Sequence, residues 1–229
     1  MSLINRRRVI MAAASGGGAA FAYDDIPDQL FRISSSEGSL VNSGAVLTEV
    51  VDASAAGEAI SVSGTPVYTA SDSNLNGQPS FAPPGVSVPG INGGNIAFVA
   101  LVVYLDSTGN RWLFDGDSSG NQCYVLRQAT TGDLTSNFGA TAASAESPAT
   151  VGRKRGLLPL DGSTSLLWNA GTGGVIDENT LSITDGFKVG CRYNDGNSCA
   201  NVAFFMACSS VPSAPLIAAL EAKLAVDYG

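Results

Sequence analysis

The sequence predicts an all-β protein: a two-sheet β-sandwich with a C-terminal α-helix and an extended N-terminal arm. A length of 229 residues suits one all-β domain. Only 14% of the residues are charged, whereas 27 are glycine, a composition typical of packed strands joined by tight turns. Short β-favouring runs recur between Gly, Asn, Asp and Pro turns, and hydrophobic residues at 45% can fill a core. About a dozen such runs favour a sandwich or jelly roll.

Residues 1–23 are predicted to form the arm. Three basic residues, Arg6, Arg7 and Arg8, precede a weakly apolar stretch of alanine and glycine that is too short to span a bilayer. The pattern is also close to a twin-arginine export signal with an A-x-A cleavage site. A docking arm and an uncleaved export signal therefore both stay open, and we favour the arm.

The arm is expected to dock on a partner. An Ala/Gly-rich segment has too little apolar surface to order alone, so a partner surface must hold it. The large apolar side chains Ile10, Met11 and Phe21 would add contact area there. The folded domain would then cover residues 24–229.

The strands are expected at short apolar and β-branched runs. The run 96–105 is nearly continuous in such residues and should be a central strand, followed after a turn by 111–115. The Asp-Gly pair at 161–162 predicts a hairpin between 157–160 and 163–169. The other expected strands are 30–33, 45–51, 60–62, 67–70, 123–128, 180–183, 187–193 and 202–208.

The closing helix is predicted at about 213–226. Apolar residues fall at helical spacing, with Leu216, Leu220 and Leu224 on one face that should pack on the sandwich. Ser213 can act as the N-cap, and Pro215 sits in the first turn, where proline is tolerated.

Composition excludes several functions. A net charge of −8 argues against nucleic-acid binding, which needs clustered Lys and Arg. The chain has no histidine, so the commonest general base and metal ligand is absent. Four cysteines lack the spacing of a zinc site. We favour reduced thiols, with a hairpin disulfide between Cys191 and Cys199 as the alternative.

Two loops have ligand-like composition. Asp115, Asp117 and Asn121 resemble a calcium loop, although Ser119 stands where a third ligand is expected. No other cofactor is expected. The second loop carries an aromatic residue with amide and carboxylate groups of the kind found in sugar sites. Its residues are Tyr193, Asn194, Asp195 and Asn197.

The plainer interpretation of both loops is an ordinary turn, and we favour it. Trp112 and Trp168 could stack on a sugar ring, but a tryptophan in an apolar strand is usually core, so we expect both inside. The basic cluster 153–155 is expected in an exposed loop.

The order of these features resembles LamG-like, concanavalin A-like lectin/glucanase domains. The ending 211–229 looks like their closing helix, and 187–192 with 202–205 looks like their paired late strands. The segments 65–81 and 112–117 are similar to their early segment and middle strand. The likeness covers roughly 40–229 and rests on order and spacing. It implies a component of tailed-phage virions.

The resemblance also shows which catalytic motif of the superfamily this sequence lacks. Glycanases of this superfamily carry Glu-x-Asp-x-Glu on one strand, which places two carboxylates on one face. This sequence lacks that triplet, and the adjacent Asp177 and Glu178 would point to opposite sides. We therefore expect no catalytic residues and a protein that is not an enzyme.

The sequence-based hypothesis is a structural protein of a phage virion, made in the host cytoplasm. It would be a tail, fibre or capsid-decorating component, anchored to other virion proteins through its arm, and it would form homo-oligomers with no membrane span. The alternative is a carbohydrate-binding module for a host surface glycan. A Tat-exported secreted protein is a third, weaker interpretation.

Overall fold

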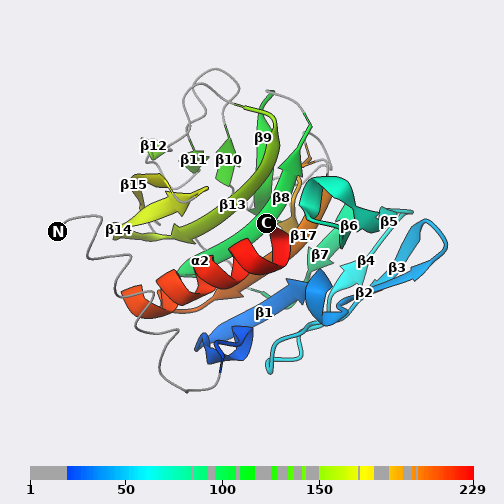
Figure 1. The fold of residues 1–229 in the computed structure, drawn as a ribbon, viewed down its shortest axis with the longest axis horizontal. Helices are drawn as coiled ribbons and strands as arrows, with labels where there is room; N and C mark the ends of the chain where they lie inside the picture. Colours follow the sequence, from blue (N-terminus) through cyan, green and yellow to red (C-terminus); the bar gives the residue numbers. More distant parts are fainter. Residues whose placement is uncertain are drawn as a thin grey trace.

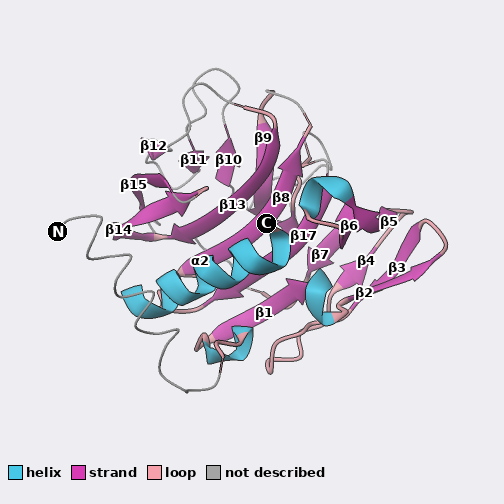
Figure 2. Cartoon of the chain, in the orientation of Figure 1, coloured by secondary structure: helices cyan, strands magenta, loops and turns pink. Residues whose placement is uncertain are grey.

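The computed structural model describes residues 20–83, 85–91, 96–106, 109–116, 125–127, 134–136, 141–142, 150–169, 171–177, 186–192, 198–199 and 201–229. Within them the chain forms two antiparallel sheets and one α-helix, α2 (Ala214–Tyr228) (Figures 1 and 2). The predicted all-β sandwich with a C-terminal helix is therefore confirmed.

The larger sheet has ten strands in the order β15-β14-β13-β8-β17-β6-β5-β3-β2, and β1 also pairs with β17. The long strand β8 (Phe98–Leu105) lies in its middle, as the apolar run predicts. The other strands are β1 (Gln29–Ser34), β2 (Leu40–Ser43), β3 (Val46–Val50), β5 (Val67–Asp72), β6 (Gln78–Ala82), β13 (Gly152–Pro159), β14 (Asp161–Trp168), β15 (Gly171–Asp177) and β17 (Asn201–Cys208).

The smaller sheet has seven strands in the order β12-β11-β10-β9-β16-β7-β4. Its members are β4 (Ser61–Val62), β7 (Val86–Val88), β9 (Arg111–Gly116), β10 (Val125–Arg127), β11 (Leu134–Ser136), β12 (Thr141–Ala142) and β16 (Phe187–Val189). Three short 3-10 helices also occur: η1 (Tyr23–Asp25), η2 (Ser35–Glu37) and η3 (Ser73–Leu75).

The main core lies between the two sheets and centres on four aromatic rings. Phe31 and Phe205 from the larger sheet stack with ring centroids 5.8 Å apart, and Phe187 and Phe114 from the smaller sheet lie 5.1 Å apart. Phe205 joins the two pairs, at 5.5 Å from Phe187. Interlocked rings of this kind add to the free energy of burying their area and fix the distance between the sheets.

A second core lies outside the larger sheet, under α2. The helix begins after Ser213, the predicted N-cap, and buries Ile217, Leu220, Leu224 and Tyr228. These side chains pack on outward-facing residues of β8 and β17. Figure 1 shows α2 running along this face of the sheet. No helix of the described residues is long and apolar enough to cross a membrane.

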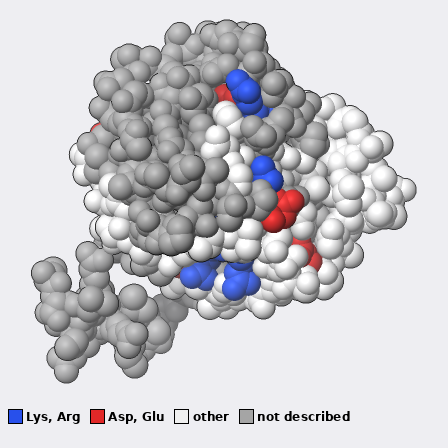
Figure 3. Space-filling view, turned by 90° about the horizontal axis from the view of Figure 1, so that it is seen from above, with Lys and Arg blue, Asp and Glu red and all other residues white. Residues whose placement is uncertain are grey.

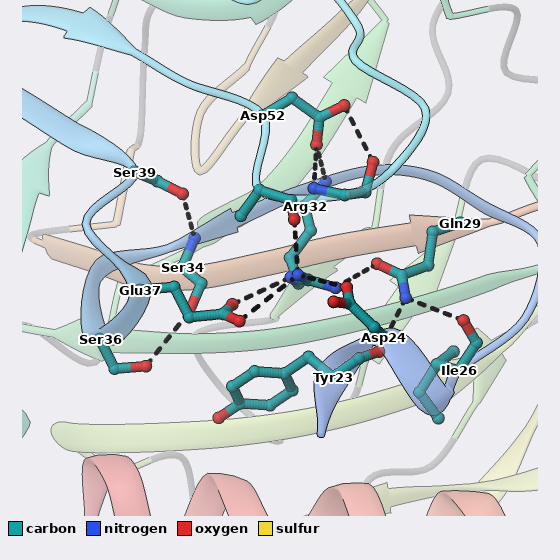
Figure 4. Close-up of polar contacts among 12 residues, drawn as sticks. Tyr23, Asp24, Ile26, Gln29, Arg32, Ser34, Ser36, Glu37, Ser39 and Asp52 are labelled. Atoms are coloured by element: carbon teal, nitrogen blue, oxygen red, sulfur yellow. Dashed lines mark hydrogen bonds and ion pairs between the residues drawn. The ribbon is translucent and has the colours of Figure 1, made fainter.

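A buried arginine holds the segments before and after β1 (Figure 4). The Arg32 guanidinium, 1% exposed, forms ion pairs with Asp24 at 2.8 Å and Glu37 at 3.0 Å. It also donates to Gln29 Oε1 and to the carbonyl oxygen of Ala53. A buried charge with several good acceptors is stabilised, so this residue ties three loops to the strand.

The basic cluster at 153–155 does not lie in an exposed loop, contrary to the expectation. All three residues belong to β13, and Lys154 is buried, donating to Thr150 Oγ1 at 2.6 Å. The long aliphatic stem of lysine can be buried while its ammonium keeps a polar partner. The presence of three basic residues therefore did not imply an exposed loop.

Candidate functional site

The outer face of the smaller sheet is the candidate ligand-binding surface. The inner faces of both sheets form the main core, and α2 covers the outer face of the larger sheet. On β16, β7 and β4 of the smaller sheet, the residues on either side of Lys188, Ser87 and Ser61 belong to the core or pack against it, so these three side chains lie on the outer face. These positions carry polar side chains.

A row of polar residues crosses four strands on this face. Register places Lys188 of β16 opposite both Asp115 of β9 and Ser87 of β7, and Ser87 opposite Ser61 of β4. Directly opposite side chains lie close together, so the four form a continuous line. Three strand spacings give the line a length of roughly 14 Å.

Trp112 extends this row because β9 contains a bulge. Val125 pairs with Phe114 and the next residue, Leu126, pairs with Trp112, so Leu113 is an extra residue. Such a residue breaks the alternation of faces. Leu113 and Phe114 both join the core between the sheets, whereas Trp112 belongs to neither core cluster. Trp112 is buried, as expected, although it belongs to neither core cluster.

Arg192 lies against the Trp112 ring. Its guanidinium carbon is 5.1 Å from the ring centroid, which is a cation–π contact. Two backbone contacts fix the position of Trp112. Ser198 forms an isolated parallel β-bridge with Trp112, and the Cys199 thiol donates a hydrogen bond to the Trp112 carbonyl oxygen. The contact orients a planar group with several donors beside the polar row.

We call Trp112, Arg192 and the row Asp115, Lys188, Ser87 and Ser61 the outer-face site. It combines two cationic donors, two hydroxyls and the buried carboxylate of Asp115. These groups can bond the vicinal hydroxyls of a sugar from several directions. On the face drawn in Figure 3, the surface that is not grey shows only small, separated groups of acidic and basic atoms.

The predicted ligand residues lie partly in this region. Asp115 is part of the row, with a lysine opposite, which is an unfavourable neighbour for a bound cation. Asp117 and Asn121 lie outside the described residues, as do Tyr193, Asn194, Asp195 and Asn197. In the described part of the chain, no three His, Cys, Asp or Glu residues cluster so as to hold a metal.

The predicted arm is described only at its end. Arg6, Arg7, Arg8, Ile10 and Met11 lie outside the described residues, so docking on virion proteins stays a prediction. Phe21 is half-buried and packs on the core cluster under α2 of its own domain. Tyr23 is buried there, and its burial raises the pKa of its hydroxyl, as does the hydrogen bond that this hydroxyl donates to Asp227 at 2.7 Å.

A surface groove that the sequence did not indicate lies beside the end of the polar row. Its volume is about 410 Å³, and the Ser63 amide donates to the Gly85 carbonyl oxygen at 2.8 Å across it. Gly85 has φ +111, which favours glycine. The lining includes Ser63, Thr65, Pro66, Val67, Pro83 and Gly85.

Comparison with known proteins shows similarity of fold. No family model and no curated protein matches the sequence. An arabinofuranosidase complexed with arabinofuranosyl-α-1,2-xylobiose has a TM-score of 0.51 at 12% identity, covering 92% of this chain and 60% of that one. A GH54 α-L-arabinofuranosidase E221Q mutant gives the same score and identity over 90% and 60%. A Trypanosoma rangeli sialidase gives 0.48 at 13% identity, covering 95% and 37%.

These neighbours correct one expectation. The chain was expected not to be an enzyme, and that expectation is contradicted because glycosidases share its architecture. The chain spans at most about 60% of the length of these structures. At 12% identity the likeness establishes the fold and not the chemistry.

Proposed function

We propose that the protein binds a saccharide on the outer face of its seven-stranded sheet. The observation that carries this proposal is the register that brings Asp115, Lys188 and Ser87 into one line beside the Trp112–Arg192 pair. Lys188 and Arg192 would donate hydrogen bonds to ring and hydroxyl oxygens of the sugar, and the buried Asp115 opposite Lys188 would orient its ammonium. A line of roughly 14 Å suits an oligosaccharide rather than a single sugar.

The fold supports a sugar as the ligand. Structures with TM-scores of 0.51 include arabinofuranosidases, one of them complexed with arabinofuranosyl-α-1,2-xylobiose. Arabinose-substituted xylooligosaccharides are therefore the first ligands to test. The sequence suggests a carbohydrate-binding module as the alternative function, with the sugar bound by the loop at residues 193–197. The present proposal keeps the sugar as ligand and moves the binding site to the sheet face.

Calorimetric titration with arabinofuranosyl-α-1,2-xylobiose tests the proposal. We expect saturable binding that weakens by roughly 10- to 100-fold in Lys188→Met and Arg192→Met, since a hydrogen bond to a charged group contributes about 1.5–3 kcal/mol. Arg153→Met is the matched control, because Arg153 lies on β13 of the other sheet. Circular dichroism shows that each variant is folded.

Two results would count against the proposal. Absence of saturable binding to a panel of neutral and acidic oligosaccharides would remove it, and unchanged affinity in both folded variants would move the site elsewhere. Release of nitrophenol from 4-nitrophenyl α-L-arabinofuranoside is measured in parallel. Turnover of this substrate would show that the bound sugar is also hydrolysed.

A further inference from the structure

Two buried cysteines lie beside each other at the ends of the segment that follows β16. Cys191 and Cys199 are 0% and 1% exposed, and both are thiols in the structure. The Cys199 amide donates to the carbonyl oxygen of Gly190 at 2.7 Å. This hydrogen bond places Cys199 next to the peptide unit that joins Gly190 to Cys191.

Backbone geometry limits the distance between the two cysteines. The path from the Cys199 Cα runs through its own nitrogen, the hydrogen bond and the peptide unit to the Cys191 Cα. The planar trans peptide holds the Gly190 oxygen about 2.8 Å from the Cys191 Cα, so with the 2.7 Å hydrogen bond and one N–Cα bond the two Cα atoms lie at most roughly 7 Å apart. Disulfides require Cα atoms about 4.4–6.8 Å apart.

We propose that Cys191 and Cys199 form a disulfide when the chain folds in an oxidising environment. A thiolate of one cysteine attacks a small disulfide such as oxidised glutathione, giving a mixed disulfide and one reduced glutathione. The second cysteine then attacks the protein sulfur of that mixed disulfide and releases the second glutathione. The two thiol protons leave with the two glutathione thiols.

Cys208 is the natural comparison within the chain. It is also buried, on β17, and burial raises the pKa of its thiol to about 12. A thiol with so high a pKa is a poor nucleophile at neutral pH. Its amide and carbonyl neighbours belong to β1 and β8, not to the segment between the other two cysteines.

The disulfide would stabilise the region around Arg192. Closing a short loop lowers the entropy of the unfolded chain, and for this spacing we expect a rise in Tm of roughly 5–10 °C over the reduced protein. The hydrogen bond from the Cys199 thiol to the Trp112 carbonyl oxygen would be lost in exchange.

The test is to refold the full chain in a glutathione redox buffer, because buried thiols react slowly in the native state. Trypsin cleaves after Lys188 and Arg192, so Cys191 lies on the peptide 189–192, while Cys199 and Cys208 lie on 193–223. We expect mass spectrometry to find the two peptides linked, with the link retained in Cys208→Ser and lost in Cys199→Ser.

A matched melting experiment separates the disulfide from packing effects. The Tm of the wild-type protein should fall when a reductant is added, whereas the Tm of Cys191→Ser should not respond. Recovery of unlinked peptide 189–192 after refolding would overturn the proposal, as would a link to Cys123 or Cys208. Neither outcome depends on whether a sugar binds, so the two proposals fail independently.

Discussion

Lys188 lies directly opposite Asp115 across the antiparallel strands β16 and β9, which puts two opposite charges side by side on the outer face of the smaller sheet. Asp115 is fully buried, so its carboxylate depends on nearby groups for stabilisation. We expect Lys188→Met to lower the free energy of unfolding by about 1–3 kcal/mol.

Urea denaturation of the two single variants and the double variant Asp115→Asn/Lys188→Met measures how far they are coupled. We expect the double variant to lose less than the sum of the single losses, because removing both charges leaves neither unpaired. Additive losses would show that the two side chains act separately.

Arg32 should be one of the most sensitive residues of the domain. Arg32→Met removes the partner of Asp24 and Glu37 and leaves the Ala53 carbonyl oxygen without its donor. We expect a loss of about 2–4 kcal/mol in unfolding free energy, measured by urea denaturation. Arg111→Met is the comparison, because its ion pair with the exposed Asp106 should contribute less than about 1 kcal/mol.

Gly156 is required by the ring that packs across from it. A Cβ atom at this position would lie 2.9 Å from Cζ3 of Trp168, its partner on β14. We expect Gly156→Ala to destabilise the fold by about 1–3 kcal/mol. In a Trp168→Leu background the same change should have a smaller effect, and thermal melts of the four proteins check this. An equal effect in both backgrounds would place the strain elsewhere.

Asp161 should make stability depend on pH at the β13–β14 hairpin. Partial burial disfavours its charge, but hydrogen bonds from Thr164 and Ser163 outweigh this and hold the pKa of the Asp161 carboxyl below 3.8. A lowered pKa stabilises the fold above the usual value, and that contribution is lost as pH falls through the folded-state pKa. We expect Asp161→Asn to be less stable than wild type at pH 7.

The difference between Asp161→Asn and wild type should shrink as pH is lowered from about 5 to 2, where both side chains are neutral. Denaturation midpoints across this range measure it. A constant difference would mean that the amide geometry, and not the charge, accounts for the change.

Local sequence signals predicted the closing helix and the long central strand, whereas strands such as β2, β6, β7 and β15 were not predicted. The helical spacing of Leu216, Leu220 and Leu224 predicted α2, and the apolar run at 96–105 predicted β8, because both patterns depend on neighbouring residues. The outer-face site could not be found this way. Asp115 and Lys188 are far apart in the sequence, and only sheet pairing brings them together.

The position of Trp112 also could not be predicted from neighbouring residues in the sequence. Its burial was expected, but strand alternation alone would place it on the same side as Phe114, in the core between the sheets. The extra residue Leu113 reverses its direction, and a bulge of this kind depends on the partner strand β10 rather than on the local sequence.

The pairing of β1 with β17 has a consequence for how the protein folds. Ile33 lies opposite Phe205, so the first strand can complete its hydrogen bonds only after nearly the whole described chain is present. Contacts so distant in sequence slow the search for the native state. Shorter N-terminal fragments would leave the Phe31 ring without its stacking partner, and we expect such fragments to aggregate instead of folding in part.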